Sequence, residues 1–87
     1  MTQPEATTAE NTAVDMKDVD VFLSGVVLYI RIRSDSPPRR ILVVTKTGRR
    51  YKASMASRTM RYAYYKITVP IKEIDVFEIE RIEVLER

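Results

Sequence analysis

The chain has 87 residues, enough for one small domain, and it contains neither histidine nor cysteine. Disulfides, zinc sites built on Cys or His, and Ser–His–Asp or Cys–His catalysis are therefore excluded, and we expect no enzymatic activity, no metal and no cofactor. The formal charge of +3 combines three blocks of opposite sign, with −4 on residues 1–20, +11 on residues 21–72 and −4 on residues 73–87, and such segregation of charge predicts a charged partner.

Residues 1–18 are rich in Thr, Ala and acidic residues and contain no aromatic residue. A segment of this kind cannot bury enough apolar area to offset the entropy lost on ordering. We therefore predict a disordered acidic tail over residues 1–18 and a single β-barrel domain over residues 19–87. No secretory signal is visible and no apolar run approaches the roughly 20 residues of a membrane span, so we expect a cytoplasmic or nucleoid-associated protein with no membrane partner.

The first strand is predicted over residues 19–33, where apolar residues alternate with others toward the end of the segment. Gly25 is expected to form a bulge in this strand. The alternative is a helical start that ends at Gly25. Residues 34–40 are predicted to be a loop, because Pro37 and Pro38 lack backbone donors and restrict the residues before them.

A hairpin is predicted over residues 41–55, with residues 46–48 as its loop and Gly48 supplying a positive φ. This register gives the hairpin one apolar face, whereas a slip of one residue would mix the two faces. The apolar face comprises Ile41, Val43, Tyr51, Ala53 and Met55, and the opposite face carries Arg50 and Lys52.

A strand over residues 60–69 is indicated by its Tyr and β-branched residues. Ala63, Tyr65, Ile67 and Val69 share one face, and Met60, Tyr62, Tyr64 and Lys66 share the other. Residues 71–77 are expected to form a helical turn. The last strand is predicted over residues 79–85, with a change of phase between Ile79 and Ile82.

Five strands with hairpin spacing predict an all-β fold, a small antiparallel five-stranded barrel with the layout of Src-homology-three-like or Sm-like barrels. A small β-sandwich is the alternative.

The basic block, residues 21–72, also contains tyrosines on predicted strand faces. A polyanion needs many cations on one surface, because each phosphate contact releases counterions, and exposed aromatic rings can stack on bases or wedge into a groove. We therefore predict a nucleic-acid-binding module, for DNA or RNA, that is mostly non-specific for sequence. The predicted phosphate contacts are Arg31, Arg33, Arg49, Arg50, Lys52, Arg58, Arg61 and Lys66, and the predicted stacking or wedge residues are Tyr62 and Tyr64.

The alternative function is a protein–protein interaction module or a structural subunit of a larger assembly, self-associating through β edges. Charged strand faces are then only solvated surface, and the tyrosines belong to a sheet buried on both sides. The acidic residues 73–87 are expected to be an exposed face, or to pair with the basic block in the same chain or in a second copy.

Overall fold

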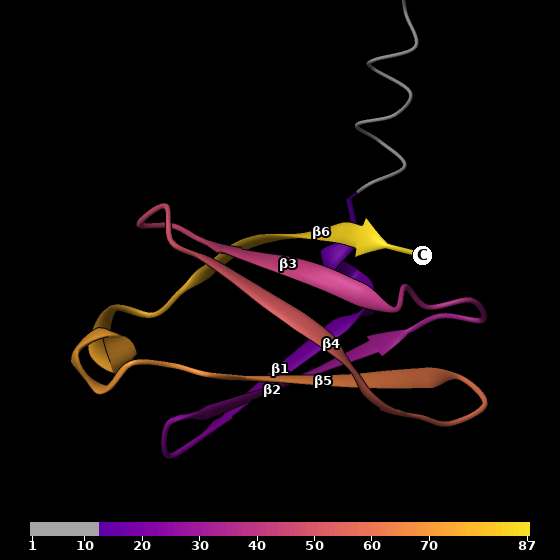
Figure 1. The fold of residues 1–87 in the computed structure, drawn as a ribbon, viewed down its shortest axis with the longest axis horizontal. Helices are drawn as coiled ribbons and strands as arrows, with labels where there is room; N and C mark the ends of the chain where they lie inside the picture. Colours follow the sequence, from indigo (N-terminus) through magenta and orange to yellow (C-terminus); the bar gives the residue numbers. More distant parts are fainter. Residues whose placement is uncertain (1–12) are drawn as a thin grey trace, which may run out of the picture.

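The computed structural model describes residues 13–87, which form a curled half-barrel of six antiparallel strands with almost no helix (Figure 1). One sheet joins the strands in the order β1-β2-β5-β4-β3-β6. The strands are β1 (Val19–Ser24), β2 (Val27–Arg33), β3 (Arg40–Thr45), β4 (Arg50–Arg58), β5 (Tyr62–Thr68) and β6 (Ile79–Glu86), with 3-10 turns η1 (Met16–Asp18) and η2 (Ile71–Val76). The predicted all-β class is confirmed.

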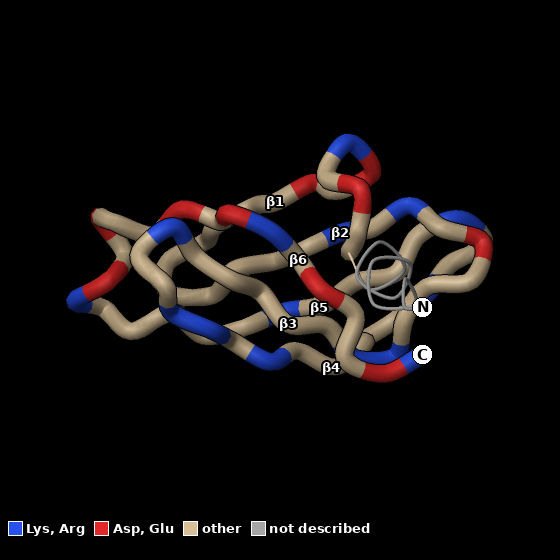
Figure 2. Tube along the Cα trace, turned by 90° about the horizontal axis from the view of Figure 1, so that it is seen from above, with Lys and Arg blue, Asp and Glu red and all other residues tan. Residues whose placement is uncertain are grey.

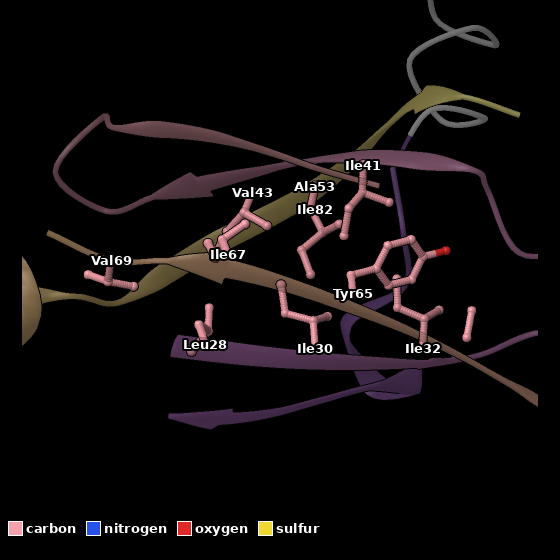
Figure 3. Close-up of a cluster of buried hydrophobic side chains, with 11 residues drawn as sticks. Leu28, Ile30, Ile32, Ile41, Val43, Ala53, Tyr65, Ile67, Val69 and Ile82 are labelled. Atoms are coloured by element: carbon pink, nitrogen blue, oxygen red, sulfur yellow. The ribbon is translucent and has the colours of Figure 1, made fainter. Parts of the chain in front are cut away.

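The core lies between the two curled halves of this sheet, with β2 and β5 on one side and β3 and β6 on the other (Figures 1 and 3). The predicted hairpin register is confirmed, because Ile41 pairs with Ala53 and Val43 pairs with Tyr51. The buried face predicted for β5 is also confirmed. The core comprises Leu28, Ile30, Ile32, Ile41, Val43, Ala53, Ala63, Tyr65, Ile67, Val69 and Ile82.

The prediction for residues 19–33 is wrong, because the segment forms two strands instead of one strand with a bulge or a helical start. Gly25 has a φ of 62° and begins a reversal of the chain, after which Val27 pairs with Ser24. A left-handed φ is accessible to glycine at little cost and suits the two-residue turns of hairpins. Because this hairpin divides the expected first strand into β1 and β2, the sheet has six strands instead of five.

Two predictions near the C-terminus are confirmed. The helical turn is η2, and the change of phase appears as a shift in the pairing of β6 with β3. Val44 pairs with Arg81 and Thr45 pairs with Ile79, so β6 carries one extra residue at this point.

Ala13 and Val14 contact the half-barrel, although residues 1–18 were predicted to form a disordered tail. Ala13 bridges Glu83 of β6, and the Val14 amide donates to the Ile82 carbonyl at 2.9 Å. Val14 also packs against the core. The edge of β6 provides hydrogen-bond partners for the backbone of this segment, and the core provides an apolar contact for Val14. Composition alone does not reveal these contacts. The rest of the predicted tail, residues 1–12, lies outside the described residues.

Replacing Gly25 tests the hairpin turn. A Cβ at this position meets no atom within 4 Å, so the effect of Gly25→Ala comes from the positive φ alone. We expect Gly25→Ala to lower the free energy of unfolding by about 1 kcal/mol, measured by urea denaturation. Gly25→Asn should cost less, since asparagine tolerates this conformation better. Equal stability of all three proteins would contradict a left-handed turn at this residue.

Candidate nucleic-acid interface

The predicted contact residues do not share one surface. Because the sheet curls around its core, the outer face of β2 and β5 points away from the outer face of β3, β4 and β6 (Figure 1). Basic residues are accordingly distributed around the half-barrel (Figure 2). The structure places Arg31, Arg33, Tyr62, Tyr64 and Lys66 on the outer face of β2 and β5, and Arg50 and Lys52 on the outer face of β4.

Cross-strand pairing brings the residues of the β2–β5 face together. Arg31 lies directly opposite Tyr64, and Arg33 lies directly opposite Tyr62. Both tyrosines are half-buried, whereas Lys66 is exposed. The predicted orientation of these residues, away from the core, is confirmed by the complete burial of Ala63 between them.

Arg31 is held in place from two directions. Its guanidinium carbon lies 4.5 Å from the centre of the Tyr62 ring, which is a cation–π distance. Its Nη2 also donates to an Asp20 carboxylate oxygen at 2.6 Å, and this hydrogen bond raises the pKa of Arg31 above its ordinary value. Arg31 therefore stays protonated and is paired with Asp20, and its guanidinium lies over the Tyr62 ring.

Arg33 and Lys66 form no ion pair on this face with any residue that the structure describes. Among the described residues, no acidic side chain lies within ion-pair distance of either one. Arg33 also lines a hollow of about 450 Å³ together with Arg61, Asp18 and Asp35, so the end of the face carries two cations and two carboxylates.

Two aromatic residues of this face were missed from the sequence. Tyr29 lies opposite Lys66 and also opposite Phe22 of β1. The Phe22 and Tyr29 rings are 6.3 Å apart and are 66% and 45% exposed. Together with Arg31 and Tyr64 they line a hollow of about 320 Å³. The alternation along β2 already placed Tyr29 beside Arg31, but Phe22 was not recognised because β1 was not predicted as a separate strand.

The basic residues of β4 lie in a different environment. Arg50 pairs with Val44, and Lys52 pairs with Leu42, while β6 places Arg81 and Glu83 on the other side of the same two residues. Val44 and Leu42 are only 4% and 8% exposed although they point away from the core. The aliphatic stems of long charged residues can cover such apolar positions, so Arg50 and Lys52 have a structural use.

Arg49 and Arg58 are engaged within the chain. Arg49 forms an ion pair with Glu73 at 3.3 Å, and Glu73 also accepts a hydrogen bond from the Tyr51 hydroxyl. Burial, and then this hydrogen bond, raises the pKa of Tyr51. Arg58 donates to the Asp35 carbonyl at 2.8 Å.

The acidic C-terminal segment pairs with the basic block of the same chain, which confirms that alternative. Besides the pair with Glu73, Arg39 contacts Glu86 at 2.8 Å and Lys46 contacts Glu78 at 3.9 Å. These contacts neutralise part of the +11 block and leave the β2–β5 face as the place where basic and aromatic residues gather.

Comparison with family models, curated proteins and solved structures finds no match to this chain. Within residues 13–87, no group of three or more acidic side chains is arranged to hold a metal ion. No helix in that range has the length and apolar character needed to cross a membrane.

Substitutions of Arg49 and Arg61 test whether the ion pair of Arg49 stabilises the fold. We expect Arg49→Ala to lower the free energy of unfolding by about 0.5–1 kcal/mol, because the Glu73 side chain, 13% exposed, loses its ion-pair partner. Arg61→Ala is the matched control, since Arg61 is exposed and no acid lies within ion-pair distance of it among the described residues. Urea denaturation measures both, and equal midpoints for the two variants would contradict the structural role of Arg49.

Proposed function

We propose that the β2–β5 face binds nucleic acid, mostly without sequence specificity. In this proposal Arg33, Arg61 and Lys66 contact phosphates, and Tyr62 and Tyr64 contact bases. The observation that carries it is the composition of the face. Neither β2 nor β5 contains an acidic residue, and their outer positions hold Tyr29, Arg31, Arg33, Tyr62, Tyr64 and Lys66.

The other outer face supports the proposal by contrast. On β3, β4 and β6 the positive residues Arg50 and Lys52 lie across β3 from Arg81 and Glu83. Arg81 itself bonds Glu83 at 2.5 Å. A polyanion approaching this face would meet carboxylates beside the cations, so the attraction would be weaker than on the β2–β5 face.

The rings of the face favour single-stranded nucleic acid as the ligand. Stacking of bases on aromatic side chains tolerates any sequence, because every base has a π-face. Duplex bases are already stacked and offer no free face. The Arg31 guanidinium lies over the Tyr62 ring at a cation–π distance, and Tyr64 and Tyr29 line the neighbouring hollow. A strand crossing the face would place bases on these rings and phosphates near Arg33 and Lys66.

The Src-homology-three-like or Sm-like type of barrel remains part of the proposal, supported by the 3-10 turn η2 directly before the last strand. A cytoplasmic or nucleoid-associated location accords with nucleic-acid binding and is proposed with it.

The salt dependence of binding tests the proposal. Three phosphate contacts, from Arg33, Arg61 and Lys66, should give a slope of log K against log salt near −2, by the rule of about −0.7 per contact for single strands. We expect Arg33→Ala with Lys66→Ala to reduce the slope to about −0.7, measured by fluorescence anisotropy with a labelled single strand of about 16 nucleotides.

Arg50→Gln with Lys52→Gln is the control, because it removes the same charge from the other face and keeps part of the aliphatic stems that cover Val44 and Leu42. Its slope should stay near the wild-type value. An equal loss in both double variants would indicate that only net charge matters, and absence of binding at low salt would reject the function.

A further inference from the structure

Strand β1 is an exposed apolar edge of the sheet. Val21, Phe22 and Leu23 are consecutive, and 44%, 66% and 38% of their surfaces are exposed. Val21 and Leu23 pair with the core residues Ile30 and Leu28, so they share the core-side face but lie beyond the core. The strand contains no lysine or proline and one acid, and therefore lacks most of the features that protect edge strands from pairing.

The other edge strand, β6, is protected. It contains three glutamates and an arginine within Ile79–Glu86, it carries an extra residue in its pairing with β3, and Ala13 already bridges Glu83. Charged residues, bulges and covering segments are the usual means of blocking an edge. The two edges therefore differ, and only β1 presents an apolar strand ready for pairing.

The hairpin turn determines which backbone groups of β1 are free. In a two-residue hairpin the closing pair, here Ser24 and Val27, exchanges hydrogen bonds, and the pattern alternates along the strands. Phe22 then bonds to β2, whereas the N–H and C=O groups of Val21 and Leu23 point toward the free edge.

We propose that β1 pairs with β1 of a second copy of this chain, antiparallel about a two-fold axis, with Phe22 opposite Phe22. This register places Val21 opposite Leu23 twice, so free backbone groups meet free backbone groups and apolar residues meet apolar residues. Asp20 then lies opposite Ser24. A register centred on Asp20 would oppose two acids, and one centred on Val21 would oppose Asp20 to Phe22, so self-complementarity selects Phe22 as the centre.

The pairing would join the proposed binding faces of the two copies. Because the two-fold axis is perpendicular to the sheet, the sheet would continue from β5 and β2 of one copy through both β1 strands to β2 and β5 of the other. Both β2–β5 faces would point to the same side. The dimer itself does not depend on the proposed function, since it is measured without nucleic acid.

Opposite charges at Ser24 give the first test. In the proposed register Ser24→Lys places a lysine opposite Asp20 of the second copy, and Ser24→Asp places two like charges there, each pair occurring twice. Cross-strand pairs of this kind should tighten the dimer dissociation constant roughly 2- to 30-fold for the lysine and weaken it by a similar factor for the aspartate. Sedimentation of the full chain at a series of concentrations measures both.

Cross-linking gives the second test. The chain contains no cysteine, so Phe22→Cys can form a disulfide only with another copy, and directly opposed residues of antiparallel strands lie within the Cα distance that a disulfide needs. Oxidation should convert Phe22→Cys to a covalent dimer. Met60→Cys, at a residue that is 86% exposed in the β4–β5 turn, should remain mostly monomeric.

A monomeric mass at every concentration would overturn the proposal. This outcome is also the one expected if another segment of the same chain, such as residues 1–12, occupies the edge of β1. Masses that rise beyond the dimer would overturn it in favour of head-to-tail pairing of β1 with β6. Equal cross-linking at positions 22 and 60, or equal dissociation constants for the two Ser24 variants, would also contradict it.

Discussion

The fold depends on burying alternate residues of one curled sheet against each other. Ile30 of β2, Tyr65 of β5 and Ile82 of β6 are at most 1% exposed and lie in the same core (Figure 3). The Tyr65 hydroxyl reaches the Pro38 carbonyl, and burial raises the pKa of Tyr65 to about 12. Because inward positions alternate with outward ones, this core fixes which basic and aromatic residues of β2 and β5 face solvent.

The same curl divides the positive charge. The +11 block is continuous in sequence, but its residues reach solvent on two faces that point away from each other. Ion pairs then distinguish the faces, since Glu73, Glu78 and Glu86 neutralise cations of the hairpin and of the start of β3. On the β2–β5 face Asp20 holds Arg31. Asp18 and Asp35 line a hollow with Arg33, but among the described residues no acid is within ion-pair distance of Arg33 or Lys66.

Period-two alternation and turn chemistry were enough to predict the β3–β4 register, the faces of β5 and the irregularity in β6. These patterns did not predict the turn at Gly25. Apolar residues on both sides of it favour one long strand, and only the glycine indicates that the chain reverses its direction there. The positions of the candidate residues were predicted in part. Arg33, Lys66 and the two tyrosines could be placed by parity, whereas the pairing of Arg49 with Glu73 joins distant segments and leaves no local pattern in the sequence.

The central claim is that nucleic acid contacts the outer face of β2 and β5. Backbone amide NMR spectra of the full chain, recorded during titration with a short single-stranded oligonucleotide, test it most directly. We expect the largest shift changes at Arg33, Tyr62, Tyr64 and Lys66, and little change along β3 and β6. Changes centred on Arg50 and Lys52, or no change at low salt, would contradict the account.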